Sequence, residues 1–202
     1  MAARILALAA MALLLAGCTI TAAQPIAPDP APTPLPTAAV DVPRQSSEIA
    51  PVEQVSAPVR IQIPSVSIDI KITPVGVEAD GLMQIPENIR VAGWYRYGPS
   101  PSSETGSTVI TAHVDSFDQG LGPFAYLKEM PADAEIIVTT GDGVDHRYRL
   151  ESVQNIQKTQ LPLDQVFDRD GAPRIVLLTC GGQFDKNVRN YSDNVVAIAN
   201  PL

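Results

Sequence analysis

Apolar and polar residues alternate along much of the chain after residue 58, with the period of two that is typical of half-buried β-strands. Pro64 and Pro74 are expected to end the first two of these strands. The Gly-Asp-Gly-Val segment at 141–144 separates two others and predicts a β-hairpin, because an Asp-Gly pair favours a tight turn. The pattern predicts strands over 59–63, 66–72, 108–111, 135–140, 145–150, 174–179 and 194–199.

Helical periodicity is thin by comparison. It is confined to 123–129 and 162–167, with room for about one or two turns in each. Seven or eight short strands with turn residues between them predict a mostly β fold, in the form of a closed, antiparallel-rich barrel with one or two short helices. Residues 59–202 are long enough to bury one hydrophobic core, so we expect one folded domain there.

The first 17 residues have the features of an export signal. The apolar stretch at 5–16 is too short to span a bilayer, but it has the length of a signal-peptide core. It runs into Leu-Ala-Gly-Cys at 15–18, which resembles a bacterial lipobox, in which the cysteine thiol receives a lipid. We therefore expect residues 1–17 to be a lipoprotein signal peptide, with Cys18 as the lipidation site. The alternative is simple cleavage after Ala23, which would give a secreted protein rather than one anchored to the outer face of the plasma membrane.

Residues 18–58 are predicted to be a disordered, proline-rich tether. Between residues 19 and 58 the chain holds nine prolines and no aromatic residue. Such a segment favours extended polyproline II and buries too little apolar area to offset the entropy of ordering. We expect a semi-rigid spacer that lifts a domain away from the membrane into the wall. A polyproline ligand for a partner domain is the alternative.

Composition and charge exclude several classes of function. The net charge is −8, and nucleic acid is therefore not an expected partner, because binding to phosphates needs clustered cations. Two cysteines cannot build a disulfide framework or a four-thiolate zinc site. The sequence has no acidic cluster that requires a metal ion, so we expect neither a metal nor a cofactor.

The candidate chemistry centres on one thiol. Cys180 follows an apolar strand, and the glycine pair that begins at Gly181 leaves room for a substrate backbone. A nucleophilic thiol needs an adjacent base or a lowered pKa, and His113 stands at the end of another predicted strand. Arg189 follows Cys180 by nine residues and offers a permanent cation for an oxyanion. Taken singly, each has a simpler interpretation: a small buried hydrophobe, a capping histidine and a loop arginine. The second histidine, His146, lies among the arginines of the hairpin and is interpreted as a surface residue.

The segments around these residues resemble one family. Leu-Leu-Thr-Cys at 177–180, followed by an arginine, resembles the sortase signature, and Thr-Ala-His-Val-Asp at 111–115 resembles the sortase histidine loop. Cys-Gly-Gly-Gln-Phe-Asp at 180–185 and Tyr-Ser-Asp-Asn-Val-Val at 191–196 are similar to the actinobacterial class F subgroup in particular. The resemblance covers about residues 59–200, which is essentially the whole predicted domain.

The resemblance implies a sortase-type β-barrel and a cysteine transpeptidase of the hydrolase class. Cys180 would attack a carbonyl carbon in an LPxTG-like sorting motif and form a thioacyl-enzyme. His113 would protonate the leaving amine and later deprotonate the incoming one. Arg189 would position the substrate and hold the oxyanion, and Thr179 and Gly181 would help to bind the substrate.

The implied partners are sorting-motif peptides of surface proteins and an amine nucleophile, either a wall precursor or a pilin lysine. We expect a monomer that meets the membrane only through its lipid anchor. Sortases usually carry a transmembrane anchor, so the lipobox at Cys18 is a departure in attachment rather than in chemistry. The family varies over 185–190, which leaves Lys186 and Arg174 as alternatives to Arg189.

Three other functions remain open at this point. An L,D-transpeptidase also uses one thiol and one histidine, but its Ser-His-Gly-Cys motif has no counterpart before Cys180. A sortase-like lipoprotein that binds a wall peptide without turnover would keep the same fold. A hydrolase would let water resolve the thioester.

Overall fold

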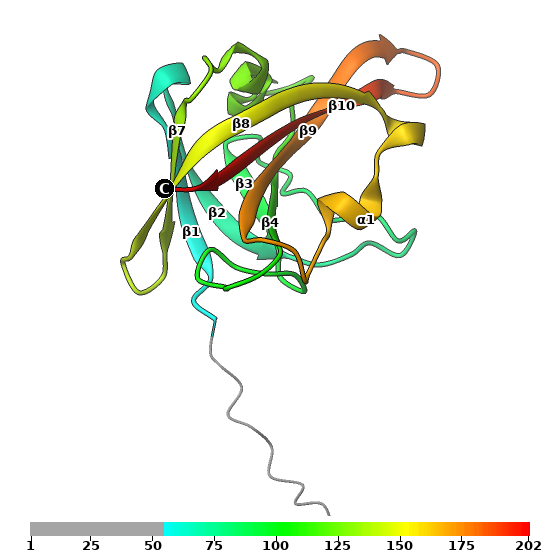
Figure 1. Cartoon of the computed structure of the whole chain (residues 1–202). Helices are drawn as coiled ribbons and strands as arrows, with labels where there is room; N and C mark the ends of the chain where they lie inside the picture. The colour runs from blue at the N-terminus through cyan, green and yellow to red at the C-terminus, as the bar shows by residue number, and fades with distance from the viewer. Residues whose placement is uncertain (1–54) are drawn as a thin grey trace, which may run out of the picture. The chain divides into compact units, whose positions relative to one another are not determined.

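The computed structural model describes residues 55–202 (Figure 1). The predicted signal peptide, Cys18 and all but the last residues of the predicted tether lie outside this range. Eight strands close into one barrel in the order β1-β2-β3-β4-β9-β10-β8-β7. The mostly β, closed barrel predicted from the sequence is therefore confirmed. Its strands are β1 (Pro58–Ile63), β2 (Ile68–Val75), β3 (Val91–Tyr95), β4 (Ser107–Thr111), β7 (Glu135–Thr140), β8 (Asp145–Gln157), β9 (Arg174–Asp185) and β10 (Asn190–Pro201).

Short helices and a small hairpin connect the strands of the barrel. The predicted helical segments are the 3-10 helix η2 (Pro123–Glu129) and the four-residue helix α1 (Leu163–Val166). None of the helices in residues 55–202 is long and apolar enough to cross a membrane. The remaining elements are η1 (Pro64–Val66), η3 (Lys158–Gln160) and a small hairpin of β5 (Asp115–Ser116) and β6 (Gly120–Leu121).

Residues that alternate between apolar and polar in the sequence alternate between the inside and the outside of the barrel. On β2, Ile68, Ile70 and Ile72 are buried, whereas Asp69 between them is exposed and pairs with Arg60 of β1. The helix η2 adds Phe124 and Leu127 to the same core, and both are fully buried. The core therefore holds β4 and β9, the strands that lead to the candidate thiol and histidine, in fixed positions.

The predicted hairpin between β7 and β8 is confirmed. The amide of Thr140 donates to the carbonyl of Val144 over 2.9 Å, and the amide of Gly143 donates back to Thr140 over 2.9 Å. Gly143 has a φ of +84°, a backbone conformation that glycine adopts without steric cost.

Several predicted strand boundaries are wrong. Pro74 does not end β2, which starts at Ile68 and continues to Val75. Beyond Lys71 the strand pairs only with β3, so the missing amide of Pro74 falls where β1 has already diverged. The strand β3 was not predicted, because its three central residues are all buried and show no alternation.

The predicted end of β9 at Thr179 is also wrong. This strand continues to Asp185 and pairs with β10 from Ile175 to Asp185, with one register shift after Gly181. The two strands form a long hairpin whose outer arm extends past the barrel (Figure 1). On its other side β9 pairs with β4 only as far as Leu178. Cys180 therefore lies within a strand, but on the β4 side it lies just past the last paired residue.

Candidate active site

The strands β4 and β9 are parallel neighbours whose carboxyl ends meet at one edge of the barrel. Their last paired residues are Thr111 and Leu178. Two residues further along each chain come His113 and Cys180. The parallel register thus brings the predicted base and the predicted nucleophile to equivalent positions, although 67 residues separate Thr111 from Leu178 along the chain.

Two threonine hydroxyls tie these strand ends together. The hydroxyl of Thr111 donates to the carbonyl oxygen of Leu178 over 3.0 Å, and that of Thr179 donates to the carbonyl oxygen of Ala112 over 2.7 Å. Both threonines are buried. Because a buried hydrogen bond has no competing water, these contacts fix the backbone just before His113 and just before Cys180.

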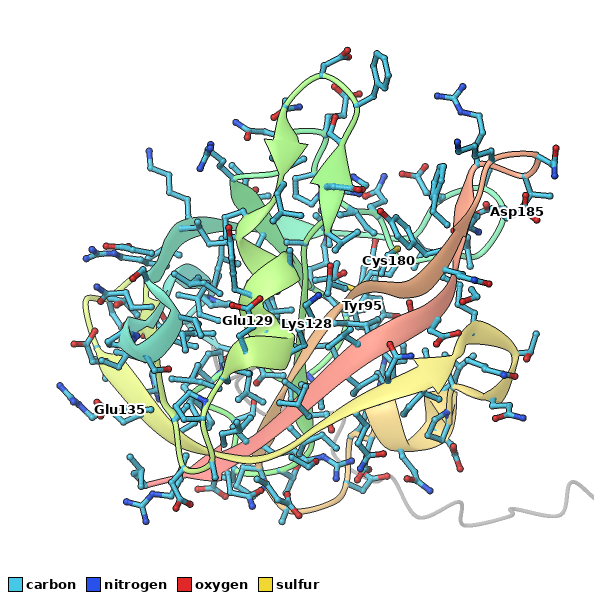
Figure 2. The ribbon with its side chains drawn as sticks, turned by 90° about the horizontal axis from the view of Figure 1, so that it is seen from above. Tyr95, Lys128, Glu129, Glu135, Cys180 and Asp185 are labelled. Atoms are coloured by element: carbon cyan, nitrogen blue, oxygen red, sulfur yellow. The ribbon has the colours of Figure 1, made fainter. Side chains whose placement is uncertain are left out.

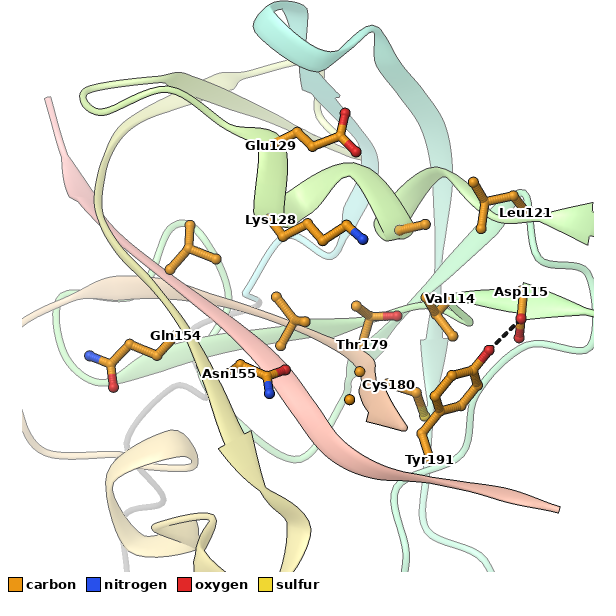
Figure 3. Close-up of a pocket in the computed structure, with 15 residues that line it drawn as sticks. Val114, Asp115, Leu121, Lys128, Glu129, Gln154, Asn155, Thr179, Cys180 and Tyr191 are labelled. Carbon is orange, nitrogen blue, oxygen red and sulfur yellow. Dashed lines mark hydrogen bonds between the residues drawn. The ribbon is translucent and has the colours of Figure 1, made fainter. Parts of the chain in front are cut away.

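The half-buried Cys180 borders a cavity of about 490 Å³ that has both apolar and charged residues in its walls (Figure 3). The β4–β5 loop, η2, β8 and β10 all contribute to its walls. Seen from above, Cys180 lies between η2, which carries Lys128 and Glu129, and the outer arm of the β9–β10 hairpin (Figure 2). We refer to this space as the acidic cavity, because two of its three charged residues are the carboxylates Asp115 and Glu129 and the third is Lys128. Its polar and charged lining residues are Asp115, Lys128, Glu129, Gln154, Asn155, Thr179, Cys180 and Tyr191.

Cys180 also borders a second cavity, of about 520 Å³, on its other side. Most of its lining is hydrophobic and comes from the loop after β2, from Tyr95 of β3 and from the loop between β8 and β9. We refer to it as the apolar cavity. Its hydrophobic lining residues are Val77, Leu82, Met83, Ile85, Tyr95, Leu161, Leu163, Phe167 and Leu178. The thiol is thus shared by two cavities of different character.

Burial sets the protonation of the histidine. His113 is half-buried, and loss of solvent lowers its pKa below the ordinary value. The nearby carboxylate of Asp115 opposes this effect but does not cancel it. The neutral imidazole is therefore favoured, which suits a residue that must take up a proton during a reaction.

A hydrogen bond joins the histidine loop to the β9–β10 hairpin. The hydroxyl of Tyr191 donates to Asp115 (Figure 3), and this bond to a carboxylate raises the pKa of Tyr191 to about 12. The ring of Phe184 packs against Tyr191 with centroids 5.0 Å apart. Asp115 is thereby committed to a protein partner. Within residues 55–202 no group of three or more His, Cys, Asp or Glu side chains is arranged to hold a metal ion.

A lysine lies against the thiol. The Nζ atom of Lys158 is 3.7 Å from the Sγ atom of Cys180, and it also donates a hydrogen bond to Oδ1 of Asn190. Lys158 is half-buried and follows directly after β8. Sequence reasoning missed it, because it lies 22 residues before Cys180 in a segment that belongs to no motif.

Comparison with known proteins identifies the family. Residues 61–202 match the family model of the sortase domain. The chain belongs to the sortase family. No curated protein matches it. The match favours a sortase over the L,D-transpeptidase alternative for this chain.

Solved structures show the same fold for this sortase. It superposes on sortase C1 of GBS pilus island 1 with a TM-score of 0.54 at 20% identity, covering 71% of this chain and 64% of that one. Sortase C-1 from Actinomyces oris gives 0.55 at 16% identity over 71% and 73%. Sortase A from Corynebacterium diphtheriae gives 0.51 at 18% identity over 73% and 61%. The present chain thus covers less than two thirds of the length of the first of these proteins, sortase C1 of GBS pilus island 1.

Of the other predicted site residues, two line a cavity beside the thiol and two do not. Thr179 and Gly181 line the acidic cavity. A Cβ atom on Gly181 would come within 2.8 Å of Asn155 Oδ1, so only glycine fits there without a shift. Arg189 lies in the exposed turn between β9 and β10 with a φ of +50°, and it is not among the described residues that line either cavity. Arg174, the alternative cation, starts β9 and donates to Ser107 and to the carbonyl of Gln165.

Proposed function

We propose that this sortase is an extracytoplasmic cysteine transpeptidase that cleaves an LPxTG-like sorting motif and joins the acyl fragment to an amine. The observation that carries the proposal is the β4–β9 register, which brings His113 and Cys180 to equivalent positions at one barrel edge. The position of Cys180 between two cavities supports a reaction with two substrates.

The proposed reaction has two acyl transfers at the same sulfur. The Cys180 thiolate adds to the motif carbonyl, the C–N bond breaks, and His113 gives a proton to the departing amine. The thioacyl-enzyme then meets the second amine, which adds to the same carbonyl while His113 removes its proton. The C–S bond breaks, an amide forms, and the thiolate is regenerated.

Arg189, Thr179 and Gly181 are proposed to support these steps. Arg189 holds the carbonyl oxygen as negative charge develops there, which requires its side chain to turn inward from the hairpin turn. Thr179 fixes the backbone beside the thiol through its bond to Ala112. Gly181 lines the acidic cavity next to the thiol and is proposed to contact the substrate there, while its missing Cβ lets Asn155 and Val195 pack closely against the strand.

The two cavities are proposed to separate the substrates. The hydrophobic lining that includes Leu82, Leu161 and Phe167 suits the Leu-Pro part of a sorting motif. The acidic cavity, with Glu129 and Lys128 in its wall, offers polar groups to an amine, which adds to the thioester in its neutral form. That amine is a wall precursor or a pilin lysine, and it approaches the thioester from the side opposite the motif.

The subtype and the cellular location belong to the same proposal. The segments at 180–185 and 191–196 support the class F subgroup. The lipobox at 15–18 supports a lipid on Cys18, an anchor on the outer face of the plasma membrane and a proline-rich tether over 18–58. Growth with an alkynyl fatty acid tests the anchor: the wild-type chain becomes labelled, and a Cys18→Ala chain that is labelled equally would exclude it.

Acyl transfer tests the chemistry. The full chain is incubated with a library of LPxTG-like peptides and an amine, and the amide product is measured. We expect Cys180→Ala to abolish product and His113→Ala nearly to abolish it, whereas Cys18→Ala serves as the matched cysteine control and retains activity. Unchanged product with Cys180→Ala would exclude the proposal. Cleavage without amide would indicate a hydrolase, and binding without cleavage would indicate a sortase-like binding protein.

A further inference from the structure

The charged groups around Cys180 are unevenly placed. Three charged residues, Asp115, Lys128 and Glu129, line the acidic cavity, and Lys158 lines the apolar cavity. Asp115 is held by Tyr191, itself a titratable group of β10 that faces the thiol. Of all these side chains, only Lys158 makes a hydrogen bond to the sulfur among the described residues.

The barrel register explains how Lys158 reaches the thiol. On β10, Asn194 pairs with Cys180 of β9 on one side and with Ile156 of β8 on the other. Ile156 and Cys180 therefore lie two strand spacings apart, roughly 9 to 10 Å. Lys158 follows Ile156 by two residues, and its long stem brings the Nζ atom to 3.7 Å from the sulfur. The hydrogen bond to Asn190 directs the amine toward the sulfur.

We propose that Lys158 is a catalytic residue that stabilises the Cys180 thiolate as its direct cationic partner. The proposal rests on the proposed function only for the identity of the nucleophile. The proton that leaves the thiol passes to His113, while Lys158 keeps its own protons and supplies a positive charge 3.7 Å from the sulfur. When the thioester forms, the negative charge leaves the sulfur, and Lys158 keeps its bond to Asn190.

Two observations favour Lys158 over Arg189 and His113 as the cationic partner of the thiolate. Arg189 lies in the exposed turn and lines neither cavity within the described part of the chain. Burial lowers the pKa of His113, which weakens the imidazolium as a partner for the thiolate. A cation in direct contact with the sulfur therefore has a role distinct from that of His113.

The pH profile of thiol alkylation tests this proposal without any peptide substrate. Iodoacetamide reacts with the thiolate, so the midpoint of its rate against pH reports the pKa of Cys180. The full chain is used, and mass spectrometry of the peptide that contains Cys180 separates its alkylation from that of Cys18. Lys158→Met and Lys158→Gln remove the charge, and Lys158→Gln keeps an N–H donor for Asn190, which preserves the local fold. Lys158→Arg keeps the charge.

We expect both neutral variants to raise the midpoint by about one pH unit, a tenfold loss of thiolate at pH values below it. Lys158→Arg should stay near wild type. The matched control is Lys186→Met, which removes the same charge from the exposed β9–β10 turn and should leave the midpoint unchanged. Equal midpoints for wild type, Lys158→Met and Lys158→Gln would overturn the proposal, as would an equal shift in Lys186→Met. A shifted midpoint together with no acyl transfer would overturn the proposed function and leave the Lys158–Cys180 pair standing.

Discussion

Thr179 donates its hydroxyl hydrogen to the carbonyl oxygen of Ala112 over 2.7 Å, so the residue before Cys180 is bonded to the residue before His113. The bond is buried and joins positions 67 residues apart in the chain. It continues the β4–β9 pairing one step past the last strand pair, at the point where the two chains separate to form the site.

Removal of this hydroxyl is expected to loosen the histidine loop. Thr179→Val keeps the shape of the side chain but leaves the buried carbonyl of Ala112 without this donor. We expect a loss of about 1–3 kcal/mol in the free energy of unfolding, measured with urea, together with a lower kcat. Thr179→Ser retains the hydroxyl and is the control. Equal stabilities for the Val and Ser variants would contradict the structural role of this bond.

Gly122 is expected to be required where η2 packs on the histidine loop. A Cβ atom at this position would lie 2.5 Å from the carbonyl oxygen of His113, so the loop or the helix must shift. We expect Gly122→Ala to lower kcat and to cost about 1–3 kcal/mol of stability, as overpacking does. Gly141→Ala is the control, because its new Cβ would meet ordinary contacts at 3.7 Å and beyond. Wild-type kcat for Gly122→Ala would show that the loop adapts without effect on the site.

The protonation of His113 can be followed directly. The chain has two histidines, so an NMR titration of the imidazole protons gives two curves, and His146→Gln assigns them. Because burial lowers the pKa of His113, we expect its midpoint below the ordinary value of about 6.5. A midpoint at or above that value would contradict the effect of burial.

A consequence for stability follows from the same shift. Since the folded pKa lies below the unfolded one, protonation of His113 opposes folding. Its contribution to stability is fully present above about pH 6.5 and is lost as the pH falls through the lower, folded value. The wild-type chain should therefore lose more stability between pH 7 and pH 5 than His113→Gln does, in urea unfolding at both pH values.

The alternation of apolar and polar residues was sufficient to predict most strands of the barrel, because it reports which side of a strand is buried. Alternation did not predict β3, because that strand is buried on both faces. It also did not predict the outer arm of β9, which continues through Gly181 by pairing with β10 alone. Motifs led to Cys180 and His113. Lys158 escaped because only the register of three neighbouring strands brings it to the sulfur, and no local pattern encodes that arrangement.

Arg189 is expected to contribute to the transition state despite its exposed position. We expect Arg189→Ala to lower kcat by about 10²–10³, as the loss of one oxyanion donor does. Arg174→Ala should act on stability instead, because its guanidinium group bonds to Ser107 and Gln165. Both variants are compared by kcat and by urea unfolding. A silent Arg189→Ala beside an inactive, well-folded Arg174→Ala would reverse these two assignments.

The transpeptidase chemistry at Cys180 is tested most directly by intact mass spectrometry of the full chain mixed with LPxTG-like peptides, with and without an amine. We expect a mass increase equal to the acyl fragment, located on Cys180, which disappears as an amide product forms when amine is added. The absence of any adduct, while iodoacetamide still labels Cys180, would contradict a sortase that works through a thioacyl-enzyme.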